Sequence, residues 1–229
     1  MGPRAVEITD EIYQVGGGSL TAPQDAAIYL VSLGTEAALI DCGCGEATDL
    51  LLANIEAAGV QPENIRTLLL THCHFNHTGG AAELRRRLGC STVAHQLDAT
   101  VIEAGDDEVS AASWYGRHLT PCPIDRKLVD RRERIVVGGR SIEAIHIPGH
   151  SPGSVAYVME SRGKRVVFGQ DVHGPLHESL RSDATAYQAS LQTLFGLEAD
   201  ILCEGHYGIF EGQGSVAAFI RRFMRPAEC

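Results

Sequence analysis

A cluster of three histidines directly after a short apolar run is the sequence feature that most constrains the fold. The run covers residues 65–71, and the cluster reads His72-Cys73-His74-Phe75-Asn76-His77-Thr78. The whole chain has 10 histidines in 229 residues, so this local density is far above chance. The pattern predicts a buried strand whose carboxyl end carries metal ligands on a turn. The amide Asn76 stands at a position of the cluster where a carboxylate would be the better ligand.

Length, composition and charge bound the class of protein. The chain is 44% hydrophobic and 21% charged, which is ordinary for a globular protein. We expect a single domain over residues 1–229. The formal net charge of -10 leaves no basic surplus for phosphates, so we expect no nucleic-acid partner. The expected partner is a small-molecule substrate, and a homodimer is left open.

The cysteines and the amino-terminal residues indicate the cellular compartment in which the protein is expected. The seven cysteines show no repeated spacing, and Cys42-Gly43-Cys44 has no second pair that would make it a zinc-finger site. The first ten residues are acidic and lack the apolar core of a signal peptide, and no stretch is long enough to cross a membrane. We therefore expect reduced thiols in a cytoplasmic protein with no membrane partner.

The order of the elements predicts the architecture. Apolar runs and helical spacing predict strands at 12–15, 26–31, 37–41, 65–70, 91–94, 134–137, 141–147, 155–159, 165–168 and 201–203, and helices at 47–58, 79–88, 184–197 and 215–224. This order, with no linker between its parts, suggests two facing sheets with helices outside. Residues 96–127 are the least regular part, and two interpretations stay open: a helical connection with loops, or a lid over a pocket.

More polar residues recur where apolar strands end. His150 stands in the turn Pro148-Gly149-His150-Ser151-Pro152-Gly153, Asp171 follows an apolar strand directly, and His206 stands in Glu204-Gly205-His206. The neighbouring glycines and prolines permit tight turns. Together with the cluster they make a set of five histidines and one aspartate. A nitrogen-rich set with one carboxylate suits zinc, and also iron or manganese.

These motifs, in this order, resemble the metallo-β-lactamase superfamily, and its glyoxalase II-like branch in particular. The family pattern is His-x-His-x-Asp-His, then a distant histidine in a Pro-Gly-His turn, then an aspartate and a last histidine. The resemblance covers nearly all of the chain and implies an α+β fold, the four-layer αββα sandwich. It implies a binuclear site with these roles: His72, His74 and His150 on a first ion, His77 and His206 on a second ion, Asp171 bridging the two, and Asp41 supporting a ligand histidine.

The function implied is that of a metal-dependent hydrolase. One or two zinc ions would activate a hydroxide that attacks a small ester, thioester or lactone. We assign Asn76, Asp171 and His173 to the catalytic group. His173 is expected either to line the pocket as a substrate contact or proton donor, or to be an ordinary surface histidine.

Asn76 departs from the family pattern, because the family has an aspartate there. An amide carries no charge and cannot act as a general base. We therefore hypothesise a tight first metal site and a labile or empty second one. Two alternative functions follow. One is a mononuclear iron enzyme similar to persulfide dioxygenases, with His72, His150 and Asp171 as ligands. The other is a degenerate member that binds metal without turnover.

Overall fold

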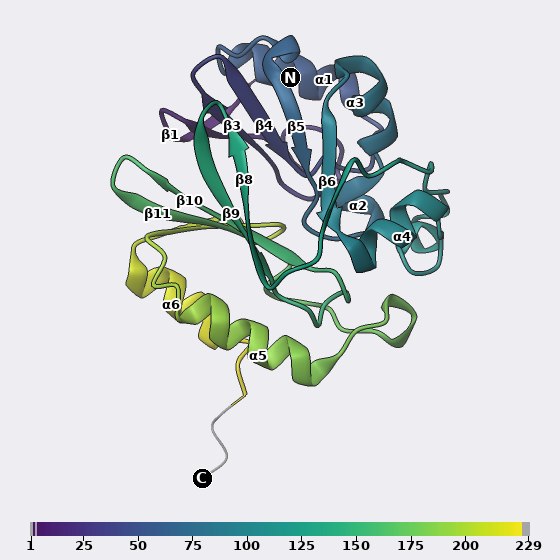
Figure 1. Ribbon diagram of the computed structural model, residues 1–229, viewed down its shortest axis with the longest axis vertical. Helices are drawn as coiled ribbons and strands as arrows, with labels where there is room; N and C mark the ends of the chain where they lie inside the picture. Colours follow the sequence, from purple (N-terminus) through teal and green to yellow (C-terminus); the bar gives the residue numbers. More distant parts are fainter. Residues whose placement is uncertain (1, 3, 226–229) are drawn as a thin grey trace.

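Two mixed β-sheets face each other and carry helices on their outer sides, as the order of sequence elements predicts (Figure 1). The computed structural model describes residue 2 and residues 4–225. The first sheet has the strand order β1-β2-β3-β4-β5-β6-β7. Its strands are β1 Val6–Thr9, β2 Ile12–Gly16, β3 Ile28–Leu33, β4 Glu36–Ile40, β5 Ile65–Leu69, β6 Ser91–His95 and β7 Arg126–Leu128. The helices that follow its strands are α1 Thr48–Ala57, α2 Phe75–Thr78, α3 Ala81–Leu88 and α4 Gln96–Ala104.

The second sheet comes from the rest of the chain and has the order β13-β12-β11-β10-β9-β8. Its strands are β8 Arg132–Val137, β9 Arg140–His146, β10 Val155–Ser161, β11 Lys164–Gln170, β12 Ile201–Glu204 and β13 Ile209–Glu211. The long helices α5 Ala184–Phe195 and α6 Gln213–Arg221 cover its outer face (Figure 1).

Three apolar clusters hold the layers together. One packs the first sheet against its helices and includes Leu39, Leu51 and Leu84. A second fills the space between the sheets, where Tyr29 and Phe168 lie with ring centroids 5.5 Å apart. The third packs the second sheet against α5 and α6. The predicted αββα sandwich is therefore confirmed.

The ligand-bearing segments meet because of strand direction. β4, β5 and β6 are parallel neighbours, so their carboxyl ends lie at one edge of the first sheet. β11 and β12 are likewise parallel in the second sheet. The segments after β5, β9, β11 and β12 carry all six residues of the expected ligand set.

Four short elements were not predicted from the sequence: β1, β7, β13 and α2. In β7, Arg126 and Lys127 are exposed and only Leu128 is buried, so no alternating pattern exists to be read. Among the described residues, no helix combines the length and the apolar character needed to span a bilayer.

Candidate metal centre

The histidine cluster leaves β5 as a turn and then enters the short helix α2. His72 and His74 precede the helix, and the backbone N–H of His77 donates to the carbonyl of His74. This single turn brings His77 back beside His72, with ring centroids 4.1 Å apart. Cys73 points the other way, into the core of the first sheet. The cluster therefore presents three imidazoles at the sheet edge and buries the residue between the first two.

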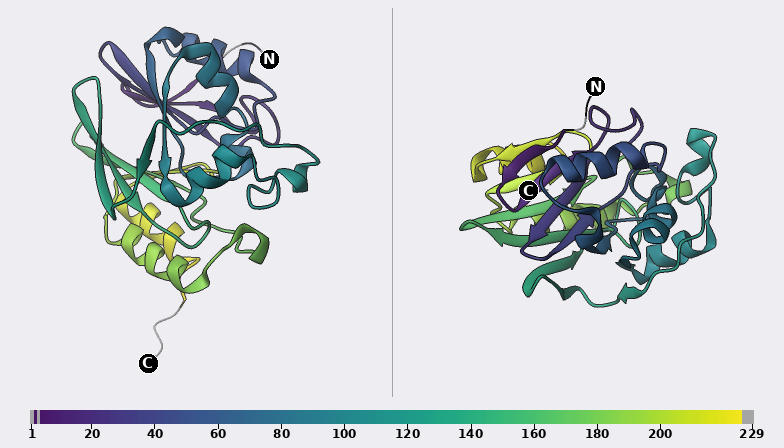
Figure 2. Two further views of the ribbon diagram at one scale, coloured as in Figure 1. Left: turned by 45° about the vertical axis from the view of Figure 1, so that its right-hand side comes forward. Right: turned by 90° about the horizontal axis from the view of Figure 1, so that it is seen from above.

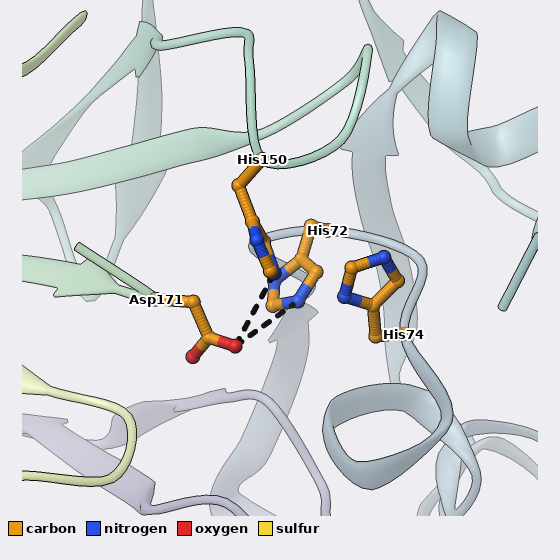
Figure 3. Close-up of side chains that lie close together, drawn as sticks. All are labelled: His72, His74, His150 and Asp171. Atoms are coloured by element: carbon orange, nitrogen blue, oxygen red, sulfur yellow. Dashed lines mark ion pairs between the residues drawn. The ribbon is translucent and has the colours of Figure 1, made fainter. Parts of the chain in front are cut away.

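Six side chains gather at this edge in two groups. Within each group, one candidate ligand atom per residue lies within 4.8 Å of the others. The groups are His72, His74, His150 and Asp171 (the first group), and His77, Asp171 and His206 (the second group). Figure 3 shows the first group, with the three imidazoles and the carboxylate pointing toward one another.

Asp171 faces both groups. Its Oδ2 lies 3.3 Å from His150 Nε2 and 3.9 Å from His72 Nε2. Its Oδ1 lies 3.2 Å from His77 Nε2 and 3.4 Å from His206 Nε2. One carboxylate oxygen is thus directed to each group, which is the arrangement needed for a residue that bridges two ions.

The far nitrogens of three imidazoles are held by the protein. His72 Nδ1 lies 3.0 Å from the Thr71 hydroxyl, and His150 Nδ1 lies 2.8 Å from the Pro175 carbonyl oxygen. His77 Nδ1 lies 2.7 Å from Asp41 Oδ2. A partner on Nδ1 fixes the ring orientation and leaves Nε2 available to an ion.

Atoms without partners show that a cation fits here. Five buried polar atoms at the centre have no hydrogen-bond partner: Nε2 of His72, His74, His77 and His150, and Oδ1 of Asp171. Buried polar atoms are costly to leave unpaired. Imidazole nitrogens and a carboxylate oxygen that converge in this way form a donor set for zinc or iron.

Burial and neighbouring charges shift the pKa values of the groups at the centre in different directions. Burial holds the pKa of His72 and of His74 well below the usual range, so both are neutral as metal ligation requires. Burial also lowers the pKa of His77, but the Asp171 and Asp41 carboxylates outweigh it and raise that pKa to about 10. Burial raises the pKa of Asp171, yet the surrounding imidazoles dominate and hold it well below its usual value.

Asp41 lies beside the centre and forms a third group of candidate ligand atoms with His72 and His77, but its carboxylate is already engaged by hydrogen bonds. It has a positive φ of 61°, and its carboxylate accepts from the Thr71 N–H and hydroxyl as well as contacting His77. Gln170, also at a positive φ of 51°, donates its side-chain N–H to Asp41 Oδ2 at 2.5 Å. Gln170 was not predicted from the sequence, because no local residue pattern indicates that the amide before Asp171 bonds to Asp41.

Asn76 contacts the second group directly. Its Nδ2 lies 3.1 Å from His206 Nε2. Either the amide donates to the unprotonated ring nitrogen or, with the amide turned over, its oxygen accepts from the ring N–H. In both arrangements Asn76 engages the nitrogen of His206 that faces Asp171.

A pocket of about 190 Å³ opens over the centre. Its floor is formed by His74, Asn76, His150, Asp171 and His206. Its walls are Ala111, Trp114, Tyr115, His173, Pro175 and Leu180. The wall residues come from two segments, 111–115 and 173–180. In the left view of Figure 2, these segments, coloured teal and green, project on the same side of the molecule.

These two wall segments contact each other. Trp114 meets His177 edge-on at 5.3 Å between ring centroids, and Arg181 lies 3.7 Å from Asp106. Within residues 96–127, α4 is a helical connection, and Ala111, Trp114 and Tyr115 line the pocket. The interpretation of this segment as a lid stays a prediction.

His173 lines the pocket, and a buried carboxylate holds it. His173 Nδ1 lies 2.8 Å from Glu204 Oε1. Glu204 is fully buried and also accepts from the N–H groups of His206 and Tyr207. Sequence reasoning missed Glu204, although it ends an apolar strand just as Asp171 does, and that signal was sufficient to find it.

The fold and this centre define a class, the proteins with an αββα sandwich and a cluster of metal-binding side chains at its edge. The sequence profile described as the metallo-beta-lactamase superfamily matches residues 22–206. The chain therefore belongs to the metallo-β-lactamase superfamily, as the motifs predict.

The individual relatives share only 26–33% sequence identity with the chain. An atrochrysone carboxyl ACP thioesterase of Passalora fulva is 26% identical over 91% of this chain and 57% of its own length. A hydroxyacylglutathione hydrolase of Anaeromyxobacter dehalogenans is 33% identical over 61% of this chain and 44% of its own. The chain therefore spans about half the length of these two relatives. The solved class B3 di-zinc metallo-beta-lactamase LRA-12, from an Alaskan soil metagenome, is 26% identical with a TM-score of 0.76, covering 90% of this chain and 79% of that one.

Proposed function

We propose that the protein is a metal-dependent hydrolase of small carboxylic esters or thioesters. The observation that carries this proposal is the convergence of unpartnered imidazole nitrogens and the Asp171 carboxylate beneath a pocket of about 190 Å³. His72, His74, His150 and Asp171 would hold the first zinc ion. His77 and His206 would hold a second ion, with Asp171 between the two.

A zinc ion bound there would lower the pKa of a bound water to about 7 and polarise a carbonyl oxygen of the substrate. The protein's own residues do the rest. Asp171 holds negative charge between the two groups, since its pKa is strongly lowered. His173, fixed by Glu204, presents a polar group from the pocket wall to the substrate. Asn76 offers only an amide, so proton transfer at its position is absent.

The choice of ester and thioester substrates is supported by the pocket walls and by the relatives. Trp114, Tyr115 and Leu180 offer an apolar surface for an acyl group. One relative is described as a carboxyl ACP thioesterase and another as a hydroxyacylglutathione hydrolase.

The test combines metal content with a substrate panel. Protein loaded with zinc is assayed on matched esters, thioesters and lactones of one acyl group, beside the metal-stripped protein and the Asp171→Asn variant. We expect turnover that is lost on stripping and restored by zinc. Zinc binding without turnover on the whole panel would favour the degenerate, non-catalytic alternative.

A second candidate, a mononuclear iron oxygenase, is favoured by one observation. Asn76 engages His206 Nε2, which leaves the first group as the only one with free ligand atoms on all its imidazoles. Of this group, His72, His150 and Asp171 match the set of two histidines and one carboxylate that non-haem iron oxygenases use. Iron in protein purified without added metal, with oxygen uptake on glutathione persulfide, would replace the hydrolase proposal by this one.

A further inference from the structure

Asp98 is a fully buried carboxylate near the metal centre that the proposed chemistry does not use. It lies in the first turn of α4. In the part of the chain that the structure describes, no hydrogen bond or ion pair joins it to any of the six candidate ligands. Its contacts are instead with the backbone segments that carry those ligands.

Three donors converge on Asp98, and they come from two segments. The N–H of Cys73 donates to Oδ2 at 2.8 Å. The Ser151 hydroxyl donates to the same oxygen at 2.6 Å, and the Gly153 N–H donates to Oδ1 at 2.7 Å. Cys73 stands between His72 and His74, and Ser151 directly follows His150. One carboxylate therefore joins the two segments that supply every histidine of the first group.

The fit around Asp98 is close. A side chain on Gly153 would place its Cβ 2.6 Å from the Asp98 carboxylate, which no real contact allows. Glycine at this position of the turn therefore permits the approach of the two segments. In the turn that carries His150, Gly153 therefore packs directly against the Asp98 carboxylate and donates a hydrogen bond to it.

Hydrogen bonds, not a cation, balance the charge of Asp98. No lysine or arginine forms an ion pair with it among residues 4–225. The three donors and the amino-terminal end of α4 are the stabilising groups. Without the carboxylate, two backbone N–H groups and one hydroxyl would be buried with no acceptor, so the two segments would move apart or rearrange.

We propose that Asp98 is a positioning residue that fixes the separation of the two segments and thereby sets the metal affinity of the first group. The proposal rests on the proposed metal site. The ring centroids of His150 lie 4.5 Å from His74 and 4.9 Å from His72 across this junction. Zinc tolerates only about 0.2 Å of deviation in its bonds to nitrogen, so small shifts of one segment weaken binding.

The central variant is Asp98→Asn, which keeps the size of the side chain but turns one acceptor into a donor. The affinity of the tight site for Zn²⁺ is measured by competition with a chromophoric chelator, independently of any activity. We expect binding at least about tenfold weaker than in the wild type, the lower end of what losing a supporting group costs a metal site.

Asp25 provides a matched control. It is also buried, and it accepts from the N–H groups of Cys44 and Ala22 and from the Thr21 hydroxyl. A Cβ on Gly43 would lie 2.6 Å from its carboxyl group, as with Asp98 and Gly153. The segments it joins carry none of the six ligands. Asp25→Asn should lower thermal stability comparably and leave the affinity of the tight site unchanged.

A milder variant covers the case in which Asp98→Asn does not fold. Ser151→Ala removes one of the three hydrogen bonds and should weaken zinc binding by about threefold. Unchanged affinity in the folded Asp98 variant, or equal weakening by Asp25→Asn, would overturn the positioning role. If the wild-type protein binds no zinc, the proposed function fails first and the inference falls with it.

Discussion

The two groups of the metal centre share Asp171 but differ in how firmly the protein holds their other members. In the first group, His72, His74 and His150 are at most 5% exposed. In the second group His77 is fully buried, but the side chain of His206 is 33% exposed. The nitrogen of His206 that faces the centre is already engaged by Asn76. This difference is the basis for proposing a tight first metal site and a weaker second one, although the set of candidate ligands is nearly complete.

The largest expected effect separates the two groups by ligand removal. His150→Ala should abolish tight metal binding and reduce hydrolysis by about a thousandfold, since the metal supplies several kcal/mol of transition-state stabilisation. His206→Ala should keep one tightly bound equivalent. Elemental analysis after dialysis and rates on one ester substrate measure both. Equal metal loss in the two variants would break the comparison.

A smaller effect is expected when the second group is strengthened. Asn76→Asp restores a carboxylate where the family has one, so the affinity for a second ion should rise by about tenfold or more, roughly 1.4 kcal/mol. Asn76→Ala also removes the contact with His206 but adds no charge. Comparing the two variants therefore separates the effect of the added carboxylate from the effect of releasing His206. The measurement is zinc titration by calorimetry. A wild-type protein that already holds two tight equivalents would contradict the weak second site.

The smallest effect concerns the helix that carries Asp98. His95 caps the start of α4, accepting from the Leu97 N–H, and stacks on His146 at 3.8 Å between ring centroids. Burial lowers the pKa of His95 to about 4, with His146 adding to the shift. The unfolded state therefore binds the proton more strongly, and stability is lost as the pH falls from about 6.5 toward 4.

His95→Asn keeps a capping side chain and removes this titration. At pH 7 the variant and the wild type should have similar free energies of unfolding. At pH 5 the wild type should have lost more than the variant, by on the order of 1 kcal/mol. Denaturant unfolding at the two pH values measures it, and parallel losses would show that His95 does not titrate in this range.

Much of the fold was predictable because its strands are buried and strongly apolar. The apolar runs that form β3, β4 and β5 were predicted directly, and the strands predicted at 134–137 and 141–147 are the β8–β9 hairpin. Short elements such as β7 were not predictable, since their pairing depends on neighbours in space. The burial of His95, which is 3% exposed, was likewise not readable from the sequence, because its stacking partner His146 comes from the other sheet.

The candidate ligands could be predicted because they directly follow strands. The residues that hold these ligands in place through hydrogen bonds could not. His72, His150 and Asp171 lie together as the motifs predict. The roles of Asp98 and Gln170 depend on hydrogen bonds across 55 and 129 residues of sequence separation. No local pattern encodes such contacts, so only the three-dimensional arrangement reveals them.

The ligands of the first group come from both sheets, and this links metal loading to the folding of the chain. His72 and His74 follow a strand of the first sheet, whereas His150 and Asp171 follow strands of the second. Neither sheet alone offers a complete set, so an ion binds tightly only after the two halves have docked. Free ion at one hundred times its dissociation constant then adds about 2.7 kcal/mol to the stability of the docked state. An ion bound by the proposed ligands would therefore hold the two halves together, in addition to its proposed role in catalysis.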